Sequence, residues 1–224
     1  MKNKQLAIKV HQLLLDRFGP PTWHPPLSPV EELVSTILSQ NTNDVNRDRA
    51  YARLVDTFDS WEEVRDADEE EVIEAVRTAG LANQKGPRIQ NALRIISRER
   101  GEINLDFLKD MKTSEAKKWL ESLKGVGPKT AAIVLLFALD KPAFPVDTHV
   151  HRVTGRLGLL PEGMSADKAH SHLADLFPPE TYYQAHLNII QLGREICQAR
   201  KPSCPECPLK DICAYYAETY QGAV

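Results

Sequence analysis

Four cysteines near the end of the chain have residue types and spacing that could bind a metal. They are the only cysteines in the sequence and follow the pattern Cys-x6-Cys-x2-Cys-x5-Cys, at Cys197, Cys204, Cys207 and Cys213. Clustered thiols in a reducing compartment are metal ligands more often than disulfides, which stay the alternative. Four thiolates suit zinc or an iron–sulfur cluster, and the spacing lacks the paired Cys-x2-Cys of zinc ribbons. The pattern therefore predicts a four-thiolate metal site.

A second pattern, Gly125-Val126-Gly127, joins two stretches of helical periodicity and is followed by Pro128. Paired glycines let the backbone approach a ligand closely, and the start of the next helix offers main-chain amides to an anion. A phosphate of a nucleic-acid backbone is the expected ligand. The alternative is an ordinary turn between helices, because Gly-x-Gly alone is common.

Lys129 stands one residue into the helix that follows this turn. The helix dipole and partial burial would both disfavour its ammonium form and so favour the nucleophilic amine. Such an amine can attack a sugar C1′, displace the base and leave a Schiff base that undergoes β-elimination. The alternative is a solvated lysine that neutralises a phosphate.

An aspartate, Asp147, immediately precedes an apolar periodic segment, which is the position of a helix N-cap. A carboxylate there could also stabilise an oxocarbenium-like transition state and help to deprotonate Lys129. The nearby His149 and His151 are expected to pack or to contact phosphate, and neither is assigned a chemical step.

Three separated motifs closely resemble the endonuclease III superfamily of helix-hairpin-helix DNA glycosylases. They are L-x-G-V-G-x-K-T-A around the hairpin, V-D-T-H-x-x-R-V around Asp147, and the cysteine pattern. The resemblance runs from about residue 25 to 213. It implies a bifunctional DNA glycosylase and AP lyase of base excision repair, with Lys129 and Asp147 catalytic. It also implies a structural or redox-sensing 4Fe-4S cluster held by the four cysteines.

The same resemblance implies a set of residues that contact double-stranded DNA with damaged bases or abasic sites. Leu81 lies where the family places an apolar wedge, and Asn41 lies where it commonly places a glutamine. The chain departs from the family pattern L-S-A-Q-x-T-D across residues 38–44. The expected DNA contacts are Gln40, Asn41, Leu81, Gly125, Val126, Gly127, Thr130 and His149. The alternatives are a hydrophobic helix stop for Leu81 and loop solvation for Asn41.

Composition limits the remaining function classes. The chain has 224 residues, 42% hydrophobic and 26% charged, with a net charge of −3, as in ordinary globular proteins. A uniformly basic surface is excluded, so DNA binding must use local basic patches and backbone amides. No apolar run is long enough to span a membrane and the first residues lack a signal-peptide core. We expect a cytoplasmic monomer, associated with the nucleoid when bound to DNA.

Helical periodicity dominates and predicts an all-α fold. Ser28 and Glu31 form a capping box, and further boxes are expected at Ser60 with Glu63 and at Asp68 with Glu71. The helix behind the first cap is expected to bury a stripe of Leu33, Val34, Ile37 and Leu38. Another amphipathic segment is expected at 45–58, with Val45, Ala50, Leu54, Val55 and Phe58 as its apolar residues. Further helices are expected from Gly86-Pro87 to Gly101, at 114–122, and near 148–157, 166–176 and 182–196.

Pro142 and Pro145 mark the best candidate for a domain boundary, because they prevent helix continuation. We expect a helical lobe at 28–141 that carries the hairpin. A discontinuous lobe of 1–27 and 142–224 would carry the cluster loop 197–213. The expected reaction is excision of an oxidised pyrimidine. Alternatives are a uracil or thymine mismatch glycosylase of the same superfamily and a non-catalytic iron–sulfur DNA-binding module.

Overall fold

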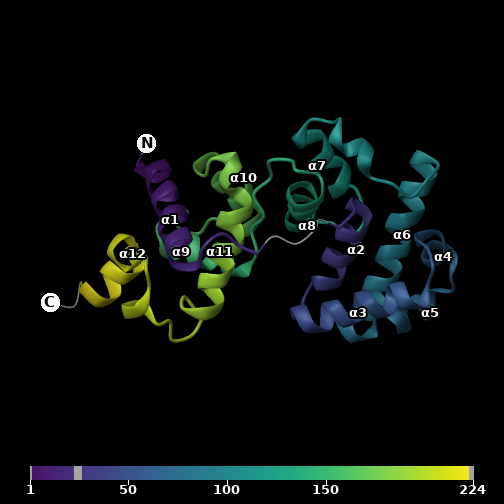
Figure 1. The fold of residues 1–224 in the computed structure, drawn as a ribbon, viewed down its shortest axis with the longest axis horizontal. Coiled ribbons are helices and arrows are strands. Elements are labelled where there is room, and N and C mark those ends of the chain that lie inside the picture. Colours follow the sequence, from purple (N-terminus) through teal and green to yellow (C-terminus); the bar gives the residue numbers. More distant parts are fainter. Residues whose placement is uncertain (1, 23–26, 222–224) are drawn as a thin grey trace. The chain divides into compact units, whose positions relative to one another are not determined.

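A computed structural model describes residues 2–22 and 27–221, and these residues contain helices and no strand. The expected all-α class is confirmed. The chain forms two compact units, Pro26–Lys141 and Met1–Pro25 with Pro142–Val224 (Figure 1). Within the described residues no helix combines the length and the apolar character that a membrane crossing requires.

The unit Pro26–Lys141 is built around helix α2 (Pro29–Ser39), whose Leu33, Val34, Ile37 and Leu38 are buried as expected. Helix α2 contacts α3, α6 and α8. The other elements of this unit are α3 (Asp44–Thr57), α4 (Trp61–Asp66), α5 (Glu69–Ala75), η1 (Arg77–Ala79), α6 (Ala82–Arg100), η2 (Asp106–Lys109), α7 (Thr113–Glu121), α8 (Pro128–Ile133) and η3 (Val134–Ala138).

The helix starts follow the predicted caps with one exception. Ser28 and Glu31 form the complete capping box. Ser60 accepts a hydrogen bond from the Glu63 amide, but the Glu63 carboxylate accepts from the Asp59 amide and not from that of Ser60, so the second box is half formed. Asp68 makes no side-chain cap, so that prediction is wrong. The Glu71 amide instead donates to the main-chain carbonyl of Asp68 over 3.0 Å, which removes the need for a side-chain acceptor.

Helix α6 begins at Ala82, earlier than the Gly86-Pro87 start that the sequence predicted. Pro87 is accommodated inside the helix near its start, where its missing N–H removes one hydrogen bond. A Cβ at Gly86 would lie 3.0 Å from Cγ1 of Ile73, so glycine here lets α6 pack closely against α5. The predicted end at Gly101 is confirmed, with φ of 80°.

Helix α3 buries a narrower face than expected. Ala50 and Leu54 are buried, whereas Val45 and Val55 are 59% and 42% exposed, which corrects the predicted apolar face. Residues five apart are separated by about 140° around an α-helix. Both valines therefore point away from the face that Ala50 buries.

In the other unit, the predicted helices near 148–157, 166–176 and 182–196 are confirmed as α9 (Thr148–Arg156), α10 (Ala166–Leu176) and α11 (Tyr182–Glu195). Helix α11 packs against α9 and α1 (Lys2–Phe18). Short elements complete the unit: η4 (Pro179–Thr181), η5 (Cys204–Glu206), η6 (Lys210–Ile212), α12 (Ala214–Tyr216) and η7 (Ala217–Gln221). The extended segment before α9 is anchored by Phe144, which stacks on Phe177 and meets Tyr182 edge-on.

Candidate active site and metal centre

The hairpin between α7 and α8 requires glycine at its first position for two reasons. Gly125 has φ of 88°, a left-handed conformation that side chains rarely adopt. A Cβ there would also lie 2.6 Å from Cδ of Arg88 on α6. Gly127, in contrast, is extended and faces open space, and no side chain caps α8 behind it. The turn therefore presents main-chain amides next to Pro128 and Lys129.

Gln40, expected as a DNA contact, holds this hairpin from within its own unit. Its Nε2 donates to the Gly125 carbonyl over 3.0 Å and to Thr130 Oγ1 over 3.4 Å. Its Oε1 accepts from Arg88 Nη1 over 3.4 Å. The role of Arg88 was not predicted, because nothing in the pattern of α6 distinguishes it from the other arginines there. The DNA contact of Gln40 stays a prediction.

Two other expected contact residues on the hairpin have buried side chains. Val126 is 5% exposed and Thr130 is 3% exposed. Any contact that these positions make with a phosphate must therefore come from the backbone.

Lys129 is the second residue of α8 and is partly buried. Its positive charge reaches the half-buried Glu32 on α2. Burial raises the pKa of Glu32, while a hydrogen bond from Thr36 and the positive charges of Arg47 and Lys129 act against that rise. Thr36, four residues further along α2, donates to the Glu32 carboxylate over 3.0 Å. Glu32 was not among the predicted site residues.

The two loops expected to enter DNA both contain a strained residue. Asn41 has φ of 52° and Leu81 has φ of 51°, a region that non-glycine residues rarely occupy. Such strain persists where surrounding structure enforces it and is concentrated at functional sites. Leu81 is also 48% exposed, which is unusual among large apolar side chains in the described part of the chain.

In the other unit Asp147 caps α9, as the sequence predicted, by accepting a hydrogen bond from the Val150 amide over 2.7 Å. The buried segment before it is fixed by two buried histidines. His170 Nδ1 lies 2.9 Å from the Phe144 carbonyl, and His186 Nδ1 lies 3.0 Å from the Pro145 carbonyl. The backbone that carries Asp147 is therefore held on both sides.

One turn further along α9, Arg152 connects His149 to the start of the cysteine loop. Its Nη2 lies 3.1 Å from His149 Nδ1 and donates to the Gly193 carbonyl over 2.8 Å, while its Nε donates to the Cys197 carbonyl over 3.0 Å. The arginine is part of the V-D-T-H-x-x-R-V motif, yet its linking role was not anticipated. The DNA contact of His149 stays a prediction.

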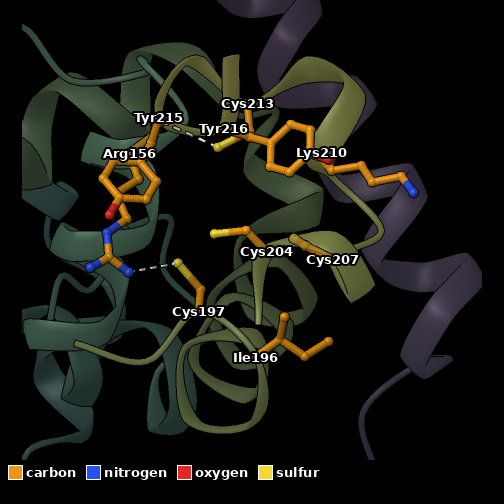
Figure 2. A pocket seen from close by; sticks show the side chains of 9 residues that line it. All are labelled: Arg156, Ile196, Cys197, Cys204, Cys207, Lys210, Cys213, Tyr215 and Tyr216. Carbon is orange, nitrogen blue, oxygen red and sulfur yellow. Dashed lines mark hydrogen bonds between the residues drawn. The ribbon is translucent and has the colours of Figure 1, made fainter. Parts of the chain in front are cut away.

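The four cysteines line one cavity, and their sulfur atoms face it (Figure 2). None of them forms a disulfide. Among the described residues, no group of three or more histidine, cysteine, aspartate or glutamate side chains is placed so that it could hold a single metal ion. The lining residues are Arg156, Ile196, Cys197, Cys204, Cys207, Lys210, Cys213, Tyr215 and Tyr216.

Two thiols of this cavity, Cys207 and Cys213, are hard to deprotonate when no metal is bound. Burial raises the pKa of the Cys207 thiol to about 11 and also raises that of Cys213, and the neighbouring thiols add to both effects. Thiolates at these two positions therefore need bound positive charge to form. Soft ligands of this kind fit an iron–sulfur cluster.

Three basic residues belong to the cysteine loop. Of these, Lys210 lines the cavity, but its ammonium points away from the sulfurs (Figure 2). Arg200 and Lys201 are exposed. Arg156 instead supplies the inner positive charge, and its role was not predicted because it is remote from the cysteines along the chain.

Comparison with known proteins gives matches over most of the chain. The model of the HhH-GPD superfamily of base excision DNA repair proteins matches residues 34–179, and that of the iron-sulfur binding domain of endonuclease III matches residues 197–213. Endonuclease III of Thermotoga maritima is 33% identical over 204 residues, covering 91% of both chains.

Two further matches agree. A putative DNA glycosylase of Arabidopsis thaliana is 36% identical over 192 residues, which cover 81% of this chain and 65% of the plant protein. The structure of a trapped endonuclease III–DNA covalent intermediate superposes with a TM-score of 0.81 at 27% identity, covering 96% of this chain and 97% of that one.

Proposed function

Since the chain belongs to the endonuclease III family and is a DNA glycosylase and AP lyase of base excision repair, we propose that Lys129 is its nucleophile, Asp147 its assisting carboxylate and an oxidised pyrimidine its substrate. One observation carries this proposal. The hairpin that precedes Lys129 is fixed by Gln40 and Arg88 and needs Gly125 in a left-handed conformation. A surface that binds a phosphate in one register can set a lysine at one defined distance from a sugar.

The proposed reaction begins when the neutral amine of Lys129 attacks C1′ of the target nucleotide. A C–N bond forms as the glycosidic bond breaks, and the base leaves with the bonding electron pair. The sugar ring then opens by breaking the C1′–O4′ bond, one of the two amine protons moves to O4′, and a protonated Schiff base remains between C1′ and the lysine nitrogen. Loss of a C2′ proton then expels the 3′ phosphate by β-elimination, which cuts the strand.

Asp147 has two roles in this proposal. Its Oδ1 caps α9 through Val150, which fixes the carboxylate while its remaining lone pairs stay available. The negative charge stabilises the positive charge that develops on the sugar as the base departs.

The cysteine loop forms an iron–sulfur binding domain, and we infer that its cluster is of the 4Fe-4S type. Cys197, Cys204, Cys207 and Cys213 would hold it, one thiolate for each iron. Such a cluster supplies redox capacity and cross-links a loop that contains little regular structure. Iron and acid-labile sulfide analysis of protein purified without oxygen tests the type, and a colourless zinc protein would contradict it.

Borohydride trapping tests the nucleophile. Borohydride reduces a Schiff base to a stable amine, so wild-type protein mixed with DNA containing an abasic site should give a covalent complex. Lys129→Ala should give none. Lys124→Ala is the matched control, because Lys124 is an exposed lysine of the same hairpin. If Lys129→Ala traps as well as wild type, the nucleophile is elsewhere.

A panel of duplexes that each carry a single lesion tests the substrate. We expect oxidised pyrimidines to be excised faster than uracil or thymine opposite guanine. If uracil or thymine opposite guanine were excised faster, the proposed substrate would be wrong, but the proposed role of Lys129 would not be affected. Light scattering of the protein with and without duplex DNA checks the proposed monomer.

A further inference from the structure

Lys85 is a lysine with a fully buried side chain that the proposed chemistry does not use. It is 1% exposed, and lysine is almost never this deeply buried without a partner. Its Nζ donates to two main-chain carbonyls, Leu38 and Ala79, each over 2.8 Å. Burial and the positive charge of Arg88 lower its pKa to about 8.

Both carbonyls belong to the ends of helices. In the last turn of α2 the Ile37 carbonyl accepts from the Gln40 amide, and the Leu38 carbonyl is left for the ammonium of Lys85. Ala79 is the last residue of η1, and its carbonyl is the second acceptor. Carbonyls at helix ends lack partners within the helix and carry partial negative charge. One buried ammonium therefore caps two helical ends at once.

The residues that follow these two ends form the loops already described. Gln40 and Asn41 follow α2, and Gly80 and Leu81 follow η1. Asn41 and Leu81 have nearly the same left-handed φ, 52° and 51°. Lys85 also lies four residues after Leu81, and its amide donates to the Leu81 carbonyl over 3.0 Å. The side chain of Lys85 therefore binds the residues that precede both loops, and its backbone amide binds Leu81 itself.

We propose that Lys85 is a positioning residue that fixes the Asn41 loop and the Leu81 loop at one spacing, so that both enter the duplex together when the target base is flipped out. This inference rests on the proposed function, because it assumes that these loops contact DNA. Base flipping needs the vacated space to be filled at a defined depth, and a loop that is free to shift would fill it poorly.

The same helix offers a matched control. Gln90 is fully buried in α6, and its Nε2 donates to the Val64 and Ala67 carbonyls over 3.0 and 2.9 Å. Like Lys85, Gln90 bridges two carbonyls at the end of a helix, but this helix is α4, which is not next to the Asn41 loop or the Leu81 loop in the chain. If Lys85 were only a structural tie, Lys85→Met and Gln90→Met would have the same consequences.

The test compares two rates in Lys85→Met and Gln90→Met, both checked for folding by circular dichroism. The first is single-turnover excision of an oxidised pyrimidine from duplex DNA, with 2-aminopurine beside the lesion to report unstacking. The second is borohydride trapping at an abasic site, where no base has to be flipped. We expect Lys85→Met to slow excision roughly tenfold and to reduce the 2-aminopurine signal, with trapping changed by less than about threefold. Gln90→Met should keep the wild-type ratio of the two rates.

The outcomes separate the positioning role from the proposed function. If wild-type protein neither excises nor traps, the proposed function fails. If wild-type protein does both, and Lys85→Met keeps the wild-type ratio of the excision rate to the trapping rate, the positioning role is wrong. The positioning role is also wrong if Gln90→Met changes this ratio as much as Lys85→Met does. Should Lys85→Met not fold, Lys85→Gln, which keeps a donor on a shorter neutral side chain, takes its place, and the same two results would overturn the positioning role.

Discussion

Arg156 Nη1 donates a hydrogen bond to Sγ of Cys197 over 3.3 Å. The same guanidinium donates to the Gln198 and Ala199 carbonyls and lies 4.8 Å from the ring centre of Tyr215. A charged donor is therefore held in place against one thiol of the four. Because hydrogen bonds to ligand sulfurs help to set the potential of an iron–sulfur cluster, this contact has a measurable consequence.

Arg156→Gln should lower the midpoint potential of the cluster. The guanidinium stabilises the more negative, reduced state, and its loss should shift the potential by on the order of tens of millivolts, since 59 mV corresponds to a tenfold change for one electron. Electrochemistry on a DNA-modified electrode measures the shift. Arg200→Gln, at an exposed arginine of the same loop, is the control, and an equal shift in both variants would contradict the assignment.

Gly125→Ala should destabilise the hairpin, whereas Gly127→Ala should not. The first substitution forces alanine into φ of 88° and against Arg88 Cδ, and a left-handed residue alone costs about 1–2 kcal/mol. The second adds a Cβ to an extended residue with nothing within 4 Å. Urea unfolding of the two variants gives the difference in stability. Equal midpoints would show that the hairpin does not depend on its first glycine.

The stability conferred by Lys85 should depend on pH. Its pKa is about 8 in the folded protein and 10.5 in the reference state, so the unfolded chain binds more protons between these values. Raising the pH through this window therefore favours folding. Wild type should gain on the order of 2 kcal/mol relative to Lys85→Met between pH 7 and 10, since one pKa unit is about 1.4 kcal/mol. A difference that stays flat over this range would mean that Lys85 is not desolvated.

Local patterns predicted much of this fold, but not its long-range polar contacts. Periodicity and caps placed α9, α10 and α11 closely, because these signals lie within a few residues of one another. The start of α6 was misplaced because Pro87 was read as a beginning, while the backbone of Leu81 sets the actual one. Arg88 and Arg156 act on partners far along the chain, and a single sequence carries no local signal for such pairs.

Lys85 illustrates the same limit most clearly. In the sequence it stands in a polar stretch and looks like a solvated lysine, yet it is buried beneath two loops. Its partners are carbonyls, which every residue has, so no residue type marks them. Only the packing of α2, η1 and α6 brings them together.

Asp147→Asn should separate the two roles of Asp147. An asparagine Oδ1 can still accept the hydrogen bond from the Val150 amide, so the cap on α9 and the stability of the protein should be kept within a few tenths of a kcal/mol. The negative charge is lost, and excision of the base should slow by roughly two orders of magnitude or more.

Asp147→Ala should slow excision as much and also destabilise the protein by about 1 kcal/mol, because it removes the cap. Single-turnover excision measured beside urea unfolding distinguishes the cases. If Asp147→Asn excises at the wild-type rate while Asp147→Ala does not, the aspartate acts through the position of α9 and not through its charge. If both variants excise normally, the carboxylate that assists departure of the base must be sought elsewhere, and Glu32, whose raised pKa is opposed by the charge of Lys129, is then the first residue to substitute.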